Sequence, residues 1–335
     1  MKNSFSRDQI EHLLTFPKNK FPEMHKVAEE DDLILFLGAG VSKLYGCPLW
    51  VEMAQKLVRR LRECGVISFA EENILFSEVD NDPRQVISIC HAKCSQKKEQ
   101  FSIYKDTILE TIEIKKEEHS NLEEVYEKIF SLNPKAYLTT NIDLGIHLYS
   151  SIVGSQNHFQ EIYNCTINSD KELIEQQGSK ILKDGNIIYL HGNAQFIENT
   201  ILTVGSYLEY YSDARFLENI YSNMENSFII FVGYGLKEWD VIEKIYKIYK
   251  SNQSGNNRGF TGFILSPIYS YEIVKFSLEQ EYYKSFGVRS IPYLIDDNGH
   301  RELLRVLKNL KDALDGSTSK PFDVFSDIEK GFSKC

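Results

Sequence analysis

Six short, mostly apolar runs constrain the fold of this chain more than any other feature of its sequence. They occupy residues 33–37, 136–139, 187–190, 228–232, 262–265 and 290–295, and each is followed by glycine, polar or acidic residues. Continuous apolar runs, as opposed to alternating ones, are typical of strands that are buried on both faces. The sequence therefore predicts a core of about six parallel strands with helices covering both sides.

Helical patterns separate most of these runs. Residues 48–64 carry apolar side chains at helical spacing, with Pro48 near the start and Gly65 just past the end, where these two residues are favoured. Similar spacing recurs near residues 238–249 and 303–310. Strands that alternate with helices predict an α/β fold with a Rossmann-like, doubly wound parallel sheet.

The interval between the first two strands is too long for a single crossover. We therefore expect helical insertions at about residues 66–132 and 150–185, which together form a smaller, mostly helical module. Residues 1–30 are expected to be an N-terminal helical extension, residues 31–310 the main domain and residues 311–335 a polar C-terminal tail.

Charge and composition exclude several classes of protein. Lys and Arg number 38 against 48 Asp and Glu, a net charge of −10, so the chain has no general electrostatic affinity for nucleic acid or anionic membranes. The apolar runs are too short to span a bilayer, and the N-terminus lacks the apolar segment of a signal peptide. Six scattered cysteines do not make a disulfide scaffold. We expect a cytoplasmic protein.

Residues that could bind a ligand or take part in catalysis follow each of the first four predicted strands. In parallel sheets, ligands bind beyond the carboxyl ends of the strands, so the four loops are expected to converge on one rim. The loops are Gly38-Ala39-Gly40-Val41-Ser42, Thr140-Asn141-Ile142-Asp143, His191-Gly192-Asn193 and Gly233-Tyr234-Gly235.

The first loop has the composition of a phosphate-binding turn. Glycines after a strand allow close approach of a phosphate, and the following helix N-terminus offers free N–H groups. Alone, the pair Gly38 and Gly40 also fits a tight turn without a ligand. A dehydrogenase would need a third glycine and a downstream acidic residue. Lys43 stands where that glycine would be, which disfavours hydride transfer.

The four loops, in this order and spacing, resemble the motif set of the sirtuin superfamily across roughly residues 30–310. They are most similar to its bacterial branch of NAD-hydrolysing, sirtuin-like effectors of anti-phage defence. That resemblance implies cleavage of the bond between nicotinamide and ribose in NAD⁺, which is then a substrate. It also implies a homo-oligomer whose activator or sensor, such as a helicase, an Argonaute-type protein or a nucleotide-binding repeat protein, lies on a separate chain.

The resemblance implies a role for individual residues. Asn141 would hold the nicotinamide-side ribose and position the attacking water, Asp143 would organise that pocket, and His191 would be the base. The residues expected to bind NAD⁺ are Gly38, Ala39, Gly40, Ser42 and Thr140, with Gly233, Tyr234 and Gly235 closing over the adenosine half.

The chemistry is compatible with these side chains. Nicotinamide leaves as a neutral molecule, and the oxocarbenium-like transition state is helped by hydrogen bonds to ribose hydroxyls. Asn supplies both a donor and an acceptor, and His accepts a proton near neutral pH. Deacetylases of the family carry two Cys-x-x-Cys pairs after the histidine, whereas here only Cys90 and Cys94 are at ligand spacing. We therefore expect no metal.

Each candidate also has a structural interpretation. His191 fits a core histidine, Asn141 and Asp143 fit turn residues, and the tyrosines at 207, 210 and 211 are better explained as core or interface than as a cofactor site. The sequence thus predicts an NAD⁺ glycohydrolase that makes nicotinamide and ADP-ribose. The alternatives are a regulatory or assembly module that binds NAD or ADP-ribose without turnover, and a zinc-free protein deacylase or ADP-ribosyltransferase.

Overall fold

A computed structural model describes residues 7–29, 32–154, 167–168, 182, 185–212, 220–224, 227–254 and 261–316. The strands are β1 Leu33–Leu37, β2 Ala136–Thr139, β3 Ile167–Asn168, β4 Asn186–Tyr189, β5 Phe228–Val232, β6 Gly262–Ile268 and β7 Val288–Leu294. The helices around the sheet are α1 Arg7–Leu13, α2 Pro22–Glu29, α3 Ala39–Lys43, α8 His119–Ser131, α9 Gly145–Ile152, α12 Val204–Ser212, α14 Trp239–Ser254, α15 Ile273–Lys284 and α16 Glu302–Leu314.

All strands pair in parallel in one sheet, in the order β3-β4-β2-β1-β5-β6-β7. From β1 the chain builds outward through β2 to β4 and then crosses to β5 on the other side of β1. The direction of winding therefore reverses between β1 and β5. In open α/β sheets, this reversal point is where ligands bind beyond the strand ends.

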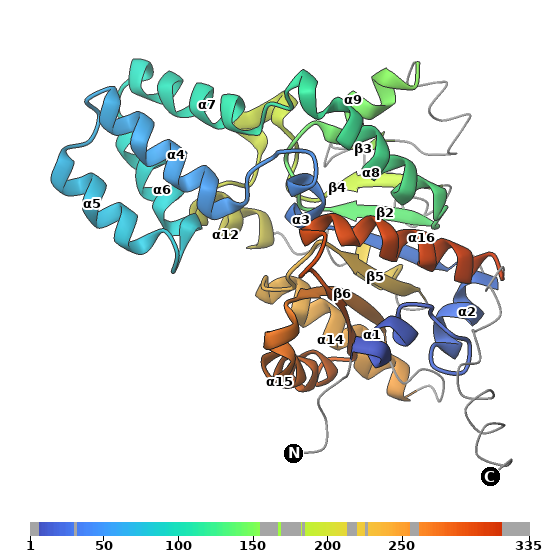
Figure 1. Cartoon of the computed structure of the whole chain (residues 1–335). Coiled ribbons are helices and arrows are strands. Elements are labelled where there is room, and N and C mark those ends of the chain that lie inside the picture. Colours follow the sequence, from blue (N-terminus) through green and yellow to red (C-terminus); the bar gives the residue numbers. More distant parts are fainter. Residues whose placement is uncertain are drawn as a thin grey trace, which may run out of the picture.

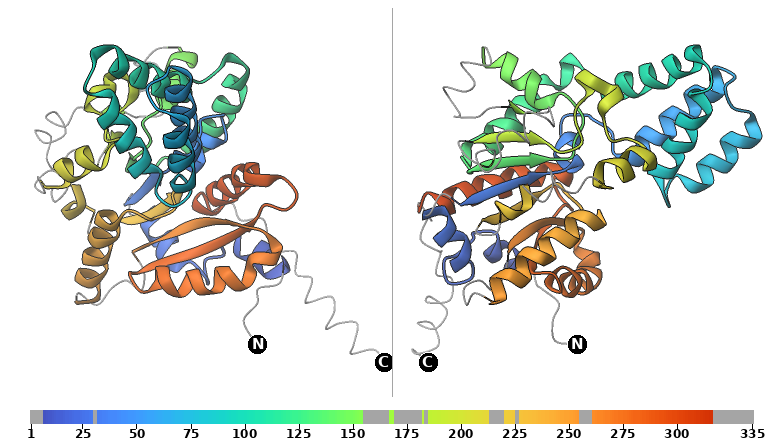
Figure 2. Two further views of the ribbon diagram at one scale, coloured as in Figure 1. Left: turned by 90° about the vertical axis from the view of Figure 1, so that its left-hand side faces the viewer. Right: turned by 180° about the vertical axis from the view of Figure 1, so that it is seen from behind.

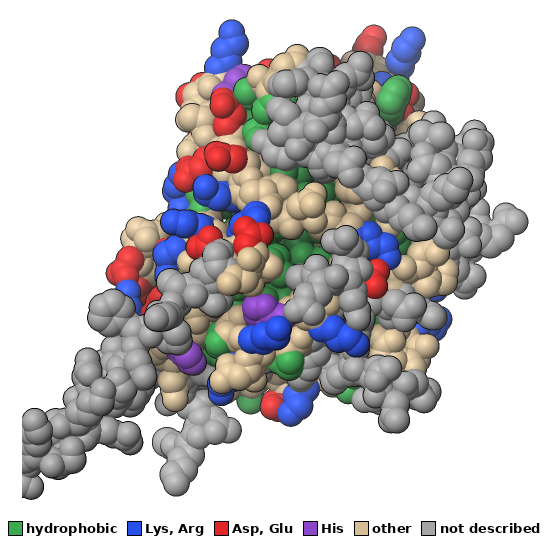
Figure 3. All heavy atoms as spheres, turned by 90° about the vertical axis from the view of Figure 1, so that its right-hand side faces the viewer, with side chains coloured by type: hydrophobic (Ala, Val, Ile, Leu, Met, Phe, Trp, Pro, Cys, Tyr) green, Lys and Arg blue, Asp and Glu red, His purple; other side chains and the backbone are tan. Residues whose placement is uncertain are grey.

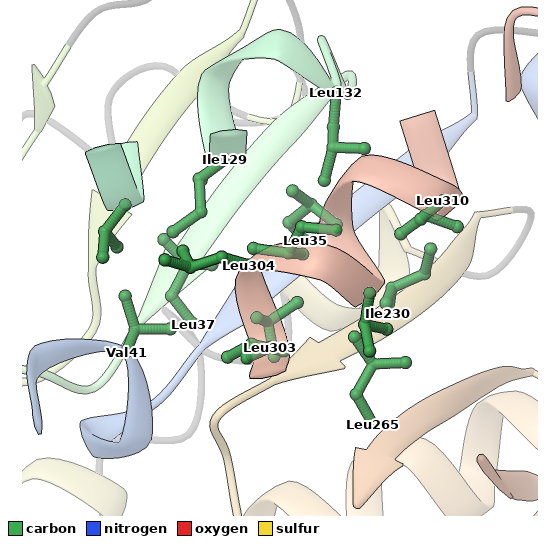
Figure 4. Packing of buried hydrophobic residues seen from close by; sticks show 14 of the residues in the cluster. Leu35, Leu37, Val41, Ile129, Leu132, Ile230, Leu265, Leu303, Leu304 and Leu310 are labelled. Atoms are coloured by element: carbon green, nitrogen blue, oxygen red, sulfur yellow. The ribbon is translucent and has the colours of Figure 1, made fainter. Parts of the chain in front are cut away.

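Alternate residues of β1 face two separate cores. Leu35 and Leu37 belong to the core under α8 and α16, and Figure 4 shows them packed with Ile129, Leu303 and Leu304. The intervening side chains of β1 lie in the second core, with the apolar face of α14. The central strands are buried along their whole length, which explains why their sequences do not alternate.

A helical module stands apart from the sheet (Figures 1 and 2). It comprises α4 Trp50–Glu63, α5 Phe69–Glu78, α6 Pro83–Cys94 and α7 Lys98–Ile112, and we call it the α4–α7 module. Its core is separate from those of the sheet, but it includes Ile142 and Leu202 from loops of the sheet domain. The module is therefore anchored to the rim at which the strands end.

The Rossmann-like parallel fold is confirmed, and all six predicted runs are strands of the sheet. The sequence did not predict β3, whose two residues at the sheet edge are too few to show periodicity. Most of the second insertion, 150–185, lies outside the described residues, as does the tail beyond residue 316. Within 66–132, α8 packs on the sheet core, so the separate module ends with α7. The domain boundaries stay predictions.

One face of the molecule carries charged side chains of both signs. Figure 3 shows the face turned away from the α4–α7 module, where Lys and Arg side chains lie among Asp and Glu side chains. Within the part of the chain that the structure describes, no helix is long and apolar enough to cross a membrane.

Removing the buried side chain of Leu35 should destabilise the fold. Leu35 is fully buried, so Leu35→Ala leaves a cavity and should lower the free energy of unfolding by about 2–5 kcal/mol in chemical denaturation. Ile74→Ala is the control, because the Ile74 side chain is 64% exposed and should cost little. Equal losses for the two variants would contradict this assignment of the core.

Candidate functional site

The glycine loop after β1 and the loop after β5 are in direct backbone contact. The Gly38 N–H donates to the Val232 carbonyl (2.9 Å) and the Gly40 N–H donates to the Gly233 carbonyl (2.8 Å). A Cβ on Gly38 would lie 2.5 Å from the Cα of Tyr234, and one on Gly40 would lie 2.9 Å from the Cα of Gly233. These glycines are therefore required for packing between the two loops. Their amides already have backbone partners.

Asn141 is tied to the glycine loop by its side chain. Its Nδ2 donates to the Gly38 carbonyl (3.0 Å) and to the Ser42 hydroxyl (2.9 Å). Its own N–H donates to the hydroxyl of Thr139, the last residue of β2 (3.0 Å). The carboxamide is thus held in one orientation by the loop after β1, and the backbone of Asn141 is held by the end of β2. This preorganisation is what a residue needs in order to position a substrate hydroxyl.

Asp143 is buried behind Asn141 and is surrounded by donors. It accepts hydrogen bonds from the Ser42 hydroxyl (2.6 Å), the Tyr45 hydroxyl (2.9 Å) and the Gly145 N–H (2.8 Å). A buried carboxylate needs such partners to offset its lost hydration. Burial and the negative charge of Asp143 hold the pKa of Tyr45 well above its usual value, so the phenol stays a donor. The Ser42 hydroxyl accepts a hydrogen bond from Asn141 Nδ2 and donates its own proton to the Asp143 carboxylate.

A narrow hollow opens between these loops and the α4–α7 module. It encloses about 40 Å³, which is room for water but not for a nucleotide. Trp50 and Met53 of α4 and Ile112 of α7 form the module's side of it. The remaining lining comes from Ala39, Ser42, Cys47, Pro48, Thr140, Asn141, Ile142 and Asp143.

His191 follows β4 and is 1% exposed. Its Nε2 lies 3.0 Å from the Tyr211 hydroxyl and 3.9 Å from Oε2 of Glu238, whereas its Nδ1 has no hydrogen-bond partner among the described residues. The pKa of His191 is lower than its usual value, mainly because the ring is buried. The negative charge of Glu238 acts to raise this pKa, and the positive charge of Arg84 acts to lower it. The imidazole is therefore neutral at neutral pH, and it is able to accept a proton.

The His191 loop and the Asn141 loop are joined. The Ala194 N–H donates to the Ile142 carbonyl (2.8 Å), and the Leu190 N–H donates to the Thr139 carbonyl (2.8 Å). The loops after β1, β2, β4 and β5 thus meet at one rim, as the parallel topology requires.

The predicted residues fall into three groups at this rim. Ala39, Ser42, Thr140, Asn141 and Asp143 line the hollow together. Gly38, Gly40 and Gly233 meet in the backbone contact beside it. His191, Tyr234 and Gly235 are not among the residues that line it.

The Tyr234 side chain belongs to the core and to the polar cluster beneath it. Its ring packs on Phe36 with centroids 4.6 Å apart, and its hydroxyl donates to Oε2 of Glu238 (2.8 Å). The Gly235 carbonyl accepts a hydrogen bond from the Tyr283 hydroxyl (3.3 Å). Their predicted role over the adenosine half stays a prediction.

The sequence analysis did not predict four residues of the site. Tyr45 lies three residues after Ser42 on the adjoining turn, and Glu238 lies three residues after Gly235, so proximity to a motif was the available signal. Tyr211, assigned to core or interface, contacts His191 directly. Arg84 lies on α6 in a different core, and no sequence pattern links it to His191.

A larger cavity of about 520 Å³ lies next to the hollow, but none of the predicted site residues lines it. Its lining is mainly apolar and comes from α7 and α9, with Ala194 from the loop after His191. Ile112 is shared with the hollow. His147, for which the sequence suggested no role, lines this cavity, and its Nε2 lies 3.0 Å from Nδ2 of Asn193.

The cysteines at ligand spacing are core residues of the α4–α7 module. Cys90 and Cys94 are fully buried, and burial raises the thiol pKa to about 12 and about 11, respectively. Metal-bound cysteine is a thiolate, so these protonated thiols pack as apolar groups. The described residues contain no cluster of three His, Cys, Asp or Glu side chains suited to a metal.

Comparison with known families agrees with this geometry. Residues 135–291 match the family model described as a SIR2-like domain, a span that includes Asn141, Asp143, His191 and Gly233. This span of the chain is therefore similar to a SIR2-like domain. No curated protein matches the chain. SIR2-like domains use NAD⁺, and the match supports the resemblance to the sirtuin-like superfamily. The glycine loop and the α4–α7 module precede the matched span of the SIR2-like domain.

Substitution of Gly233 tests the contact between the two loops. Gly233 has a φ of +61°, and a Cβ there would lie 2.5 Å from the backbone nitrogen of Val41. Gly233→Ala should therefore lower the free energy of unfolding by about 1–3 kcal/mol or more. Gly205→Ala is the control, because its Cβ would meet only Thr203 Oγ1 at 3.8 Å on helix α12. An unaltered denaturation midpoint for Gly233→Ala would contradict the tight packing.

Proposed function

We propose that the chain is an NAD⁺ glycohydrolase, which uses water to cleave NAD⁺ into nicotinamide and ADP-ribose. In this reaction the C1′–N bond breaks, and its electron pair leaves with the nicotinamide ring. The water oxygen bonds to C1′ and gives up one proton. The SIR2-like domain supports the use of NAD⁺, and the residues at the rim support the choice of reaction.

The observation that carries the proposal is the fixed carboxamide of Asn141. It lines the hollow and is oriented by the Gly38 carbonyl and the Ser42 hydroxyl. Both of these hydrogen bonds use Nδ2, so Oδ1 is left as the acceptor for a ribose hydroxyl or a water. Asp143 fixes this arrangement from behind through Ser42. Hydrogen bonds to ribose hydroxyls strengthen as positive charge develops on the sugar, which lowers the barrier.

His191 is the proposed base. Its neutral imidazole and the free lone pair on one ring nitrogen suit it to take the proton that the attacking water loses. The loop that carries it is hydrogen-bonded to the Asn141 loop, so the two functional groups move together. The small volume of the hollow implies that the α4–α7 module moves away from the rim when NAD⁺ binds.

Replacement of the two proposed residues should abolish cleavage. Purified protein is incubated with NAD⁺, and nicotinamide, ADP-ribose and cyclic ADP-ribose are resolved by chromatography. Asn141→Ala should slow cleavage by about 10²–10³-fold, as for other groups that stabilise a developing charge. His191→Ala should lose about 10²–10⁴-fold, the usual worth of a general base.

Asn81→Ala and His300→Ala are matched controls, since both side chains are exposed. Cleavage that survives both Asn141→Ala and His191→Ala would contradict the site. Tight NAD⁺ binding without turnover would favour a regulatory module, and turnover only with an acyl-peptide or a protein acceptor would favour a deacylase or an ADP-ribosyltransferase.

We also propose that the protein acts as a homo-oligomer that depletes NAD⁺ in anti-phage defence, under the control of a partner chain. Support for assembly comes from an apolar stripe formed by Val274, Leu278 and Tyr282 of α15 with Tyr271 from the turn just before that helix. Tyr271, Val274 and Leu278 are each more than 70% exposed. Exposed apolar stripes mark interaction surfaces, and symmetric pairing of identical chains is the commonest form of assembly.

A charge on this stripe should therefore dissociate the oligomer. Val274→Glu and Leu278→Glu should shift the mass measured by light scattering after size exclusion to that of the monomer. Ile74→Glu is the control, because the Ile74 side chain on α5 is similarly exposed but lies outside the stripe, and this variant should leave the mass unchanged. A monomeric wild-type protein, or a mass insensitive to both stripe variants, would contradict the interface.

A further inference from the structure

A second, largely buried polar cluster joins the α4–α7 module to the sheet domain beside His191. Arg84 lies on α6, and Glu238 immediately precedes α14. Arg84 Nη2 donates to Glu238 Oε1 (3.1 Å), and the Tyr234 hydroxyl donates to Glu238 Oε2 (2.8 Å). Only 25% of the Arg84 side chain and 13% of the Glu238 side chain are exposed, so solvent screens this ion pair weakly.

His191 lies within reach of that carboxylate. Its Nε2 is 3.9 Å from Glu238 Oε2 and 3.0 Å from the Tyr211 hydroxyl. The rings of three α12 tyrosines, Tyr207, Tyr210 and Tyr211, meet the imidazole edge-on, with centroids 6.2–6.4 Å away. The charged groups that act on its titration are Glu238, which raises the pKa, and Arg84, which lowers it.

The Arg84 guanidinium also lies over two aromatic rings. Its guanidinium lies 4.4 Å from the ring centroid of Tyr207 on α12 and 5.4 Å from that of Trp50 on α4. Trp50 also lines the hollow next to Asn141. A displacement of the α4–α7 module would therefore move Arg84 relative to Glu238.

Glu238 is placed to favour one of the two neutral forms of His191. A negative charge next to Nε2 favours the tautomer with its proton on Nε2. In that tautomer the lone pair is on Nδ1, the ring nitrogen that has no partner among the described residues. A base needs this lone pair, and the opposite tautomer would present an N–H donor in its place.

We propose that Glu238 is a positioning residue, which holds His191 in the Nε2–H tautomer so that Nδ1 accepts the proton, and that Arg84 holds Glu238 in place from the α4–α7 module. This inference rests on the proposed function, because the proton comes from the water that attacks NAD⁺. It makes the basicity of His191 dependent on how the module sits against the sheet domain.

The two halves of the ion pair should have opposite effects on His191. Glu238→Gln removes the negative charge, so the pKa of His191 falls and the acidic limb of the cleavage profile shifts to lower pH. Arg84→Gln removes the positive charge but keeps a side-chain amide donor for Glu238 Oε1, and the Tyr234 hydroxyl still holds Oε2, so the carboxylate stays and the same limb shifts to higher pH. Each shift should be about one pH unit, the size expected of a charge at this range. Glu238→Gln should lower kcat with little change in KM, and Arg84→Lys should restore the wild-type profile.

A direct measurement on His191 separates this inference from the proposed function. Nitrogen-15 NMR of the histidine rings gives the tautomer and pKa of His191 in each variant, with His191→Ala used for assignment, and it needs no turnover. We expect the wild type to carry its proton on Nε2 and Glu238→Gln to show a mixture of tautomers. Arg60→Gln, which breaks the exposed Arg60–Glu63 pair, is the matched control.

Opposite pKa shifts of His191 in Glu238→Gln and Arg84→Gln would support the inference even if no variant cleaves NAD⁺. Missing cleavage would contradict only the proposed function. Shifts in the same direction, shifts no larger than that of Arg60→Gln, or a proton on Nδ1 in the wild type would overturn it.

Discussion

The backbone contact between the glycine loop after β1 and the loop after β5 determines where everything else in the site lies. It occurs where the winding of the sheet reverses, and it is so close that a side chain on Gly38, Gly40 or Gly233 would collide with the opposite loop. Because this contact fixes the Gly38 carbonyl, it also fixes the acceptor that orients Asn141. A ligand at this rim meets loops whose relative positions are already set.

Two buried polar clusters flank the rim, and each holds one proposed functional group. Asp143, Ser42 and Tyr45 support Asn141, whereas Glu238 and Tyr211 surround His191. In both clusters a buried or largely buried carboxylate receives hydrogen bonds from neighbouring hydroxyl groups, which offsets the cost of removing its charge from water. The α4–α7 module touches both, through Trp50 at the hollow and Arg84 at Glu238. Its placement is therefore linked to both groups at once.

The sequence predicted those features that depend on local patterns. The apolar runs of β1, β2 and β5 coincide with the strands because burial on both faces favours apolar residues at nearly every position; the exception, Thr139, donates its hydroxyl to the Leu37 carbonyl. The convergence of Asn141 with the glycine loop followed from the parallel topology alone. The sequence analysis explained Gly38 and Gly40 by the approach of a phosphate. The structure adds a second reason, since packing against the loop of Gly233 already requires glycine at both positions. The contacts of Arg84 and Tyr211 could not be predicted, because Arg84 reaches Glu238 from a separate core and Tyr211 reaches His191 through packing between elements, neither of which is encoded in any periodicity.

The tight fit of α4 over the rim has a thermodynamic consequence for recognition. A ligand that needs the hollow widened binds only the fraction of molecules in which the module has moved, so its apparent dissociation constant is the intrinsic one divided by that fraction. Each 1.4 kcal/mol spent on separating Ile142 and Leu202 from the module core weakens apparent affinity about tenfold. Any molecule that props the module open would lower the half-saturating ligand concentration without touching Asn141 or His191. The resting affinity of this rim thus depends on the apolar packing of Ile142 and Leu202 against the module as well as on its polar groups.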